Sequence, residues 1–349
     1  MLNPLSALLS IRALFKTRRQ IKRSLALQHV MLPGKYKIHW SEKPVLYNEE
    51  NSSVIENKQI VYPKFLTFFF SRPIVLNYAD FVFRGEYAIF SLNREMKIFS
   101  VANHQVLTVM PREKKERLQN AAERLSVLNL TFLHAVDSGI VDRWVNDELK
   151  AAPFSQKKHL YLQFLDEYKN FICHSPIQGK DASKERMKKI SNCGSHISNV
   201  ITRMSQLVSE EEYPVIFSHC DMHIDNMLFE NGKIWYIDIE YARDEIFIYD
   251  VFIGMVVAFW NYGDGLLLKE YIYGNGDLVN RITAVFDAAG TTFHVENKKK
   301  YLFDFLAARL VFDIENGKKR FNKIGFLRYM KYLARQNNKV LDYIEGLHD

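Results

Sequence analysis

A short β-hairpin predicted in the second half of the chain constrains the fold more than any other part of the sequence. The dipeptide Asn231-Gly232 separates two apolar segments within Val215–Tyr241, and Asn-Gly is a strong signal for a two-residue hairpin turn. A hairpin brings its open ends together, so the loop before its first strand meets the residues after its second. We therefore expect three polar residues to cluster at one end of a rigid hairpin: Asp221, Asn226 and Asp238.

The sequence around this hairpin has two textures. Between Lys58 and Met110 there are short apolar and aromatic runs bounded by turn residues, which are typical of an antiparallel meander. From Arg112 to Leu128, and through most of the chain after Asn146, apolar residues recur at the three- and four-residue spacing of helices. The sequence therefore predicts an α+β fold with a β-rich N-terminal lobe and a mainly helical C-terminal lobe.

These textures can be resolved into individual elements. Strand-like segments are expected at Phe65–Phe70, Tyr87–Leu92, Met96–Val101, Gln105–Met110, Leu130–Ala135 and Ile140–Val145. Helices are expected at Arg112–Leu128, His159–Ile172, Ser183–Val208, Tyr301–Phe312 and Phe326–Ile344. The corresponding domains are an N-terminal extension over residues 1–57, the β-rich lobe over residues 58–148 and the helical lobe over residues 149–349.

Charge and composition restrict the partners of the chain. A net charge of +7 favours anionic partners such as nucleotides, phosphorylated glycans or acidic lipid surfaces. Apolar residues within Met1–Phe15 precede a basic run, which is compatible with a helix on an acidic membrane surface and equally with a core-packing helix. The basic residues follow no recognised nucleic-acid-binding pattern, so we expect no nucleic-acid partner. The oligomeric state is not encoded in any of these features.

Cysteine content and hydropathy bear on the location of the protein. The 3 cysteines have no regular spacing and predict no disulfide framework, which fits a reducing compartment. No apolar run approaches the roughly 20 residues that span a bilayer. We therefore expect a cytoplasmic protein, with peripheral association at the inner face of the membrane if the N-terminal helix binds lipid.

The three hairpin residues have the chemistry that phosphoryl transfer requires. This reaction depends on positioning and on a metal ion that neutralises phosphate charge, and it needs little covalent chemistry from the protein. Asn226 and Asp238 supply hard oxygen ligands of the kind that Mg²⁺ prefers. Asp221, which precedes Asn226 in the same loop, is placed to accept or orient the proton of an attacking hydroxyl.

The same residues stand in a longer motif. His219–Asn226, with the sequence HCDMHIDN, resembles the H-G-D-[LM]-H-x-G-N motif of aminoglycoside phosphotransferases and choline kinases, which share the protein-kinase-like fold. Ile237–Glu240 resembles their I-D-[WFY]-E metal-binding segment, and Asp250 resembles a buried Asp that ties the catalytic loop to the next helix. The resemblance implies a two-lobed kinase that uses ATP and Mg²⁺, with these roles: Asp221 catalytic, His219 loop-stabilising, Asn226 and Asp238 metal ligands.

The nucleotide-binding half departs from the family pattern. The third meander strand, Gln105–Met110, has no lysine, and Thr108 stands where one is expected. Residues that could contact the phosphates instead, or pair with the residue that does, are Lys97, Arg94, Glu116 and Glu123. On the same resemblance, the connection between lobes meets the nucleotide base through residues such as Asp147 and Leu149.

The residues of the catalytic segment also allow a zinc site or a Cys–His nucleophile pair. His219, Cys220 and His223 suggest a zinc site, but a strand follows directly, so a helical His-x-x-x-His face is not expected. A Cys–His nucleophile pair is disfavoured because neighbours in a chain rarely point at each other. Asp225, which replaces a small residue of the family motif, is expected to face solvent. Three further acidic residues are expected to be surface charges rather than contacts to a cationic acceptor: Asp244, Glu245 and Asp313.

We therefore predict an ATP- and Mg²⁺-dependent phosphotransferase whose acceptor is a hydroxyl on a small molecule or a lipid-linked glycan. Asp238–Glu240 leads quickly into the next predicted helix without an activation segment of the protein-kinase type, which speaks against a protein substrate. The alternative is an inactive pseudokinase that serves as a nucleotide sensor or scaffold. The missing lysine favours that alternative, and the intact set of Asp221, Asn226 and Asp238 opposes it.

Overall fold

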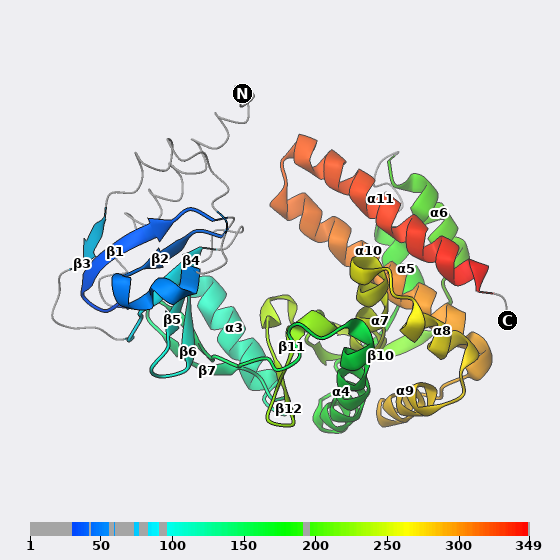
Figure 1. Cartoon of the computed structure of the whole chain (residues 1–349). Coiled ribbons are helices and arrows are strands. Elements are labelled where there is room, and N and C mark those ends of the chain that lie inside the picture. Colours follow the sequence, from blue (N-terminus) through cyan, green and yellow to red (C-terminus); the bar gives the residue numbers. More distant parts are fainter. Residues whose placement is uncertain are drawn as a thin grey trace. The chain divides into compact units, whose positions relative to one another are not determined.

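The computed structural model describes residues 30–41, 43–55, 59, 73–76, 83–90, 96–190 and 196–347. The chain divides into two compact units: the first comprises the chain up to Asn120 together with Thr131–Val145, and the second comprises Ala121–Leu130 together with the chain from Asn146. The first unit is rich in strands and the second is mainly helical (Figure 1). This confirms the predicted α+β fold class.

An antiparallel sheet forms the described part of the first unit, with its eight strands in the order β3-β1-β2-β4-β5-β6-β8-β7. Burial alternates along the strands, as in β5, where Met96 and Ile98 are buried and Lys97 between them is exposed. The strands are β1 (Gly34–His39), β2 (Val45–Tyr47), β3 (Ile74–Leu76), β4 (Tyr87–Phe90), β5 (Met96–Ser100), β6 (Gln105–Val109), β7 (Phe132–Val136) and β8 (Gly139–Arg143).

Most of the strands predicted for this unit are present. The segments expected from Tyr87, Met96 and Gln105 form β4, β5 and β6, and the two expected after Leu128 form β7 and β8. Strands β1 and β2 fall within the range assigned to an N-terminal extension, and they pair with β3 and β4 of the sheet. The apolar segment Met1–Phe15, the aromatic run Phe65–Phe70 and the candidate phosphate contact Arg94 lie outside the described residues.

The second unit is built around a buried helix. Helix α7 (Ile248–Tyr262) is buried along nearly its whole length, and such all-round burial marks a helix at the centre of a core. The other helices surround it, and the last turn of α3 (Arg112–Arg124), from Ala121, belongs to this unit. They are α4 (Phe154–His174), α5 (Ser183–Ile190), α6 (Ser198–Leu207), α8 (Leu266–Tyr273), α9 (Asp277–Ala288), α10 (Lys298–Arg320) and α11 (Lys323–Gly346).

Two small sheets accompany these helices. One is the predicted hairpin, β11 (Met227–Glu230) with β12 (Lys233–Tyr236). The other, in the order β13-β10-β9, was not expected and consists of β9 (Gly179–Ala182), β10 (Glu212–Ser218) and β13 (Arg243–Ile246). The sequence predicted that Glu240 leads quickly into the next helix, and the short strand β13 lies between Glu240 and the start of α7 at Ile248. Strand β13 was missed because its sequence, RDEI, has only one apolar residue.

None of the helices in the part of the chain that the structure describes is long and apolar enough to cross a membrane.

Candidate active site

The predicted hairpin has the turn that its sequence requires. Asn231 and Gly232 both have positive φ, 52° and 76°, which is the backbone of a two-residue type I′ turn. At the open end, Met227 pairs with Tyr236, and the backbone N–H of Ile237 donates to the carbonyl of Asn226 at 3.1 Å. The loop that carries Asp221 and Asn226 therefore lies beside the segment that carries Asp238.

A buried carboxylate fixes the start of this loop. Asp250, in the first turn of α7, accepts hydrogen bonds from the backbone N–H groups of His219 and Cys220 at 2.9 and 2.8 Å. The Cys220 backbone has a φ of 62°, so these two bonds hold a turn that few non-glycine residues adopt. Burial raises the pKa of Asp250 to about 7. This contact is the tie between loop and helix that the family resemblance implied.

His219 fixes the other side of the loop. Its ring Nε2 lies 2.9 Å from the carbonyl of Ile237, and since a carbonyl can only accept, Nε2 carries the proton. The side chain is fully buried, and burial lowers the pKa of His219 to about 4, so the ring is neutral at physiological pH. His219 therefore joins the catalytic loop to the residue before Asp238, which is a positioning role.

Asn226 and Asp221 are in direct contact. The amide nitrogen of Asn226 donates to the backbone carbonyl of Asp221 at 2.8 Å and to its carboxylate Oδ2 at 3.0 Å. The same nitrogen lies 3.2 Å from Nε2 of His223. Because these contacts all engage the nitrogen, the amide oxygen of Asn226 is the atom left to face a cation.

The local charges keep Asp221 ionised. Burial on its own would raise the pKa of Asp221, but interaction with His223 and with the charge of Arg309 outweighs burial and lowers the pKa below its ordinary value of 3.8. Nε2 of His223 lies 3.6 Å from one carboxylate oxygen, and a guanidinium nitrogen of Arg309 lies 3.9 Å from the other. The side chain of Asp221 is therefore an ionised carboxylate at neutral pH.

Asp238 stands just beyond the second strand of the hairpin. It has a φ of 65° and precedes a single 3-10 turn, Ile239–Tyr241, and its side chain is exposed. The amide oxygen of Asn226 and the carboxylate of Asp238 are hard oxygen donors that suit Mg²⁺, which commonly takes one or two protein ligands and completes its shell with phosphates and water. Within the described residues, no group of three or more His, Cys, Asp or Glu side chains is placed to hold a metal ion.

Sequence reasoning missed one residue of this site, Arg309 on α10. Besides approaching Asp221, its Nε donates to Asp313 at 3.0 Å and its guanidinium contacts the hydroxyl of Tyr249 at 3.3 Å. The expectation that Asp313 is a surface charge is therefore wrong, since it is buried against Arg309. The motif gave no signal for Arg309 because the residue lies far along the chain, on a helix that returns to the catalytic loop.

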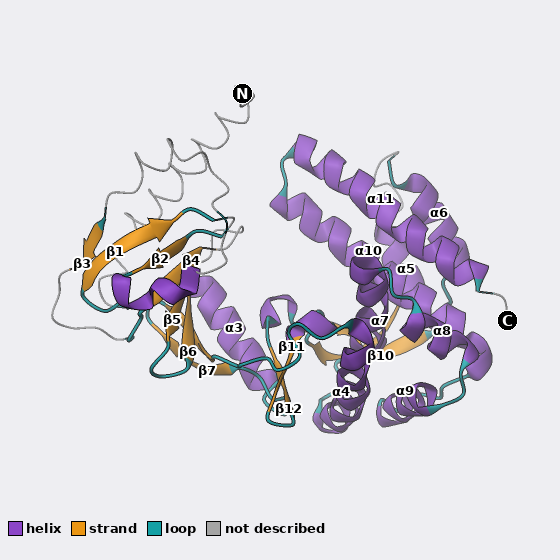
Figure 2. Ribbon diagram, in the orientation of Figure 1, coloured by secondary structure: helices purple, strands orange, loops and turns teal. Residues whose placement is uncertain are grey.

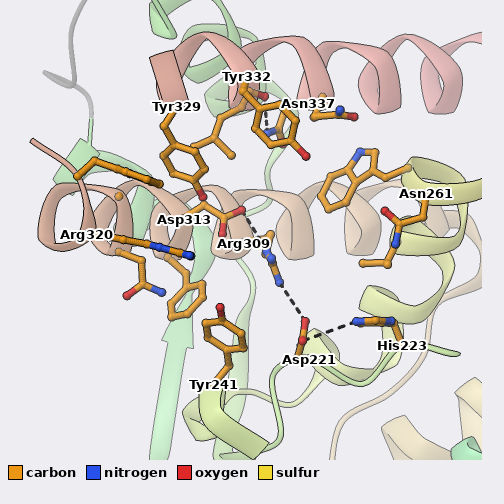
Figure 3. A pocket seen from close by; sticks show the side chains of 18 residues that line it. Asp221, His223, Tyr241, Asn261, Arg309, Asp313, Arg320, Tyr329, Tyr332 and Asn337 are labelled. Carbon is orange, nitrogen blue, oxygen red and sulfur yellow. Dashed lines mark hydrogen bonds and ion pairs between the residues drawn. The ribbon is translucent and has the colours of Figure 1, made fainter. Parts of the chain in front are cut away.

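Asp221 opens onto a pocket within the second unit. The pocket has a volume of about 340 Å³, and Figure 3 shows Arg309 between Asp221 and Asp313 at its wall. Helices α10 and α11 supply most of the other side. The lining includes six aromatic side chains and four amides: Tyr241, Trp260, Phe312, Phe321, Tyr329 and Tyr332, with Asn261, Asn316, Gln336 and Asn337.

Two candidate nucleotide contacts of the first unit, Lys97 and Glu116, are among the described residues, and both lie at exposed positions. Lys97 is exposed on β5 and has no described hydrogen bond or ion pair, and Thr108 pairs with it across the β5–β6 ladder. Glu116 accepts a hydrogen bond from Arg112 at 2.7 Å on the exposed face of α3. The structure therefore shows no contact between Lys97 and Glu116.

The predicted base contacts in the second unit pack against the hairpin. The carboxylate of Asp147 accepts from the backbone N–H groups of Phe229 at 3.1 Å and of Leu149 at 3.2 Å. The backbone N–H of Glu148 donates to the carbonyl of Phe229 at 2.9 Å. The side chain of Asp147 thus holds the connecting segment along β11.

Three other acidic residues were expected at the protein surface, and two of them lie there. Asp225 lies at the surface as predicted, where it accepts a hydrogen bond from Tyr262. Asp244 is also at the surface, paired with Arg124 at 2.9 Å. Glu245 is buried between Arg186 and Arg243, so its expected surface position is wrong. Its ion pairs stabilise β13 beneath the catalytic loop.

Part of the sequence is similar to a known protein family. Residues 114–261 match the family model of choline/ethanolamine kinases, a span that includes the catalytic loop and the hairpin and ends before Arg309. No curated protein matches the chain.

Solved structures with a similar chain path include three kinases. A choline/ethanolamine kinase family protein from Mesorhizobium loti has 12% identity and a TM-score of 0.44, over 71% of this chain and 85% of that chain. The GDP complex of aminoglycoside 2'-phosphotransferase-IIIa has 13% identity and a TM-score of 0.46, over 70% and 90%. A choline kinase from Streptococcus pneumoniae has 10% identity and a TM-score of 0.40, over 71% and 90%.

The family match covers the residues on which the resemblance was based. Asp221, Asn226 and Asp238 all lie within the matched span, and so does Asp250. The match confirms the predicted resemblance to choline kinases, and it supports a kinase whose acceptor is a hydroxyl group.

Proposed function

We propose that this chain is a kinase that uses ATP and Mg²⁺ to phosphorylate a hydroxyl of a sugar-like small molecule or glycan. The observation that carries the proposal is the position of Asp221. Its carboxylate is held by Asn226 on one side and approached by Arg309 on the other, and it lies on the wall of a pocket of about 340 Å³. A pocket of this size suits one sugar ring or a comparably small acceptor.

Asp221 would act on the acceptor hydroxyl. The acceptor oxygen forms a bond to the terminal phosphorus of ATP, the bond from that phosphorus to the bridging oxygen of ADP breaks, and the hydroxyl proton passes to a carboxylate oxygen of Asp221. Because the pKa of Asp221 is lowered, the carboxylate is charged at neutral pH and can orient the hydroxyl before transfer. Asn226 and Asp250 keep the loop in place during this step.

The proposed metal ligands are the amide oxygen of Asn226 and the carboxylate of Asp238. When bound there, Mg²⁺ supplies neutralisation of the charge on the phosphates. His219 contributes by holding the backbone of Ile237 against the catalytic loop, which fixes the distance between the two ligand-bearing segments.

The lining of the pocket favours a sugar over a simple cation. Two carboxylates, Asp221 and Asp313, are matched by two guanidinium groups, Arg309 and Arg320, so the pocket has no surplus of negative charge to attract an ammonium group. The aromatic side chains offer flat apolar faces, and the four amides can both donate to and accept from hydroxyls. We therefore propose a polyhydroxylated acceptor.

The nucleotide half of the proposal is tested by calorimetry. Wild-type protein should bind ATP or GTP only weakly without Mg²⁺ and more tightly with it, and Asp238→Ala should remove most of that difference. Asp287→Ala, an exposed carboxylate on α9, is the matched control. A folded wild-type sample that binds neither nucleotide would favour the inactive scaffold instead.

The acceptor half is tested by measuring ADP release with sugars and amino sugars on one side and with choline and ethanolamine on the other. We expect turnover with members of the first group, and Asp221→Asn should abolish it. Asp225→Asn changes a neighbouring carboxylate of the same loop and should retain activity. Faster turnover of choline than of any sugar would contradict the proposed acceptor class while leaving the kinase assignment intact.

A further inference from the structure

The last two long helices carry an unusual concentration of positive charge. Between Asn316 and Leu341 there are eight Lys or Arg residues and no Asp or Glu, whereas the other 39 basic residues of the chain are matched by all 40 acidic ones. The segment includes the end of α10, a short link and most of α11. The net positive charge of the protein is therefore accounted for by this segment.

This charge surrounds the closed end of a helical hairpin. Helices α10 and α11 lie side by side, and Figure 2 shows them joined at one end, away from α8 and α9. At the link, the side chain of Asn322 caps α11 by accepting from the backbone N–H of Gly325 at 2.9 Å, so the turn has a defined shape. Lys318, Lys319 and Lys323 are exposed around it.

Large apolar side chains are exposed at the same end. Ile324 is 66% exposed, Leu327 is 42% exposed and Phe321 is 37% exposed. Single exposed apolar residues are ordinary on a protein surface, but three within seven positions at the tip of a basic hairpin form a cluster. We name this cluster, with Lys318, Lys319 and Lys323, the basic tip.

The outward face of α11 continues the pattern. Ile324, Leu327, Arg328, Lys331 and Arg335 follow helical spacing and are all exposed, so they form one stripe that is apolar at the tip and basic beyond it. The opposite face of α11 packs into the core through residues such as Leu333, Val340 and Ile344. The exposed stripe is therefore not a core face left uncovered.

We propose that the basic tip docks on an anionic lipid bilayer. Ile324 and Leu327 would enter the boundary between headgroups and acyl chains, and the surrounding lysines would lie at the level of the lipid phosphates. A nucleic acid would satisfy the charge but would leave the exposed aliphatic side chains without a partner. The combination of apolar tip and basic surround fits a membrane surface best.

The acceptor pocket lies next to this surface. Arg320, Phe321 and Tyr332 line the pocket, and Phe321 also belongs to the basic tip. A protein docked through the tip would hold the pocket close to the headgroup layer. If the proposed kinase function is correct, a consequence that rests on it follows: the acceptor hydroxyl belongs to a sugar or glycan carried on a membrane lipid.

Vesicle flotation of the full chain, without nucleotide or acceptor, tests the docking. We expect binding to vesicles of phosphatidylcholine with phosphatidylglycerol, and little binding to phosphatidylcholine alone. The triple variant Lys318→Glu, Lys319→Glu, Lys323→Glu should bind the anionic vesicles more than about tenfold more weakly, since each basic residue near the surface adds substantially to affinity. Its control, Lys169→Glu, Lys233→Glu, Lys269→Glu, makes the same change in net charge at exposed sites elsewhere and should bind like wild type.

A second variant separates membrane insertion from simple polyanion binding. Ile324→Ser with Leu327→Ser keeps every charge, and it should weaken vesicle binding severalfold while leaving retention on heparin unchanged. Equal vesicle binding by wild type and both tip variants would overturn the proposal, as would tip-dependent binding to RNA without binding to vesicles. Because no substrate is present, failure here leaves the kinase assignment standing, and failure of the kinase assay leaves the docking result intact.

Discussion

The two units of this protein differ in how firmly their candidate catalytic groups are held. In the second unit, Asp221 is fixed by Asn226, and its loop is fixed by buried Asp250 and buried His219. In the first unit, Lys97 is an exposed side chain on a strand, and Glu116 pairs with its helical neighbour Arg112 at the surface. Preorganised groups contribute most to catalysis, so the second unit should dominate the chemistry.

This contrast explains why a chain can depart from the choline kinase pattern in one unit and keep the resembling motif in the other. A lysine on a strand contacts the phosphates of a flexible ligand as a point charge, and another cation can replace it. A catalytic carboxylate must be placed within a fraction of an ångström, and its supporting contacts come from three separate segments. The motif of the second unit is therefore harder to vary.

The largest expected effect is on turnover. Asp221→Asn should lower kcat by 10²- to 10⁴-fold, because it removes the group that accepts the hydroxyl proton. Lys97→Ala should lower kcat/KM by less than about tenfold, since an exposed charge at an unassembled site contributes little. Steady-state kinetics with a turned-over acceptor measure both, and equal losses in the two variants would break the contrast between the units.

The second-largest expected effect is a loss of folding stability when Asp250 is removed. Asp250→Ala leaves the backbone N–H groups of His219 and Cys220 buried without partners, at about 1–3 kcal/mol each. We expect the free energy of unfolding to fall by roughly 2–5 kcal/mol. Urea denaturation measures the change, and Asp287→Ala, at an exposed position on α9, should stay within about 0.5 kcal/mol of wild type. A change of similar size in both variants would mean that Asp250 is not a specific anchor.

A third prediction concerns pH and the two buried groups of the loop. The pKa of His219 is about 4 in the folded chain and 6.5 in the unfolded chain. Between these pH values the unfolded chain binds more protons, so the free energy of unfolding decreases as pH falls from 6.5 to about 4. The pKa of Asp250 is about 7 in the folded chain and 3.8 in the unfolded chain. Between these pH values the folded chain binds more protons, so the free energy of unfolding decreases as pH rises from 3.8 to about 7. The two contributions oppose each other.

Removal of His219 should therefore change the slope of stability against pH. In His219→Gln we expect stability to increase as pH falls from about 6.5 to 4, by roughly 3 kcal/mol relative to the wild-type trend. Comparing slopes, rather than single values, separates this effect from the loss of packing in the variant. Urea midpoints across the range give the slopes, and parallel curves for the two proteins would show that His219 titrates normally.

The features that the sequence predicted correctly depend on interactions between residues close together in the chain. The hairpin followed from Asn231-Gly232 and two apolar strands. The geometry of any hairpin also predicted that the segment with Asp221 and Asn226 lies beside the segment that precedes Asp238. The tie from Asp250 to the loop was implied by the family motif. All of these signals lie within a short stretch of chain, where turn chemistry and strand pairing decide the structure.

Features that depend on distant segments were not predictable in this way. Strand β13 pairs with β10, and its residue Glu245 is buried against Arg186, which is far away in the sequence. Such an ion pair leaves no apolar pattern to read. The burial of Asp313 and the approach of Arg309 to Asp221 both depend on the return of α10 past the catalytic loop. Helical periodicity predicted a helix there and could not predict which loop it passes.

Arg309 provides a modest predicted effect and the sharpest check on the site. Its charge lowers the pKa of Asp221, so Arg309→Gln should raise that pKa and move the acid limb of the kcat/KM profile to higher pH. The lowered pKa of Asp221 should place this limb at a lower pH in wild type than in the variant. The loss at neutral pH should be about tenfold, as expected when a positioning contact rather than a reacting group is removed.

The matched variant is Arg309→Lys, which keeps the positive charge near Asp221 but loses the planar fork that also contacts Asp313 and Tyr249. The acid limb of this variant should stay close to that of wild type while kcat falls. Arg309 would then act on Asp221 through its charge and on the pocket wall through its geometry. If the acid limb is the same in all three proteins, the 3.9 Å approach has no electrostatic role, and Arg309 serves only to hold α10 against the loop.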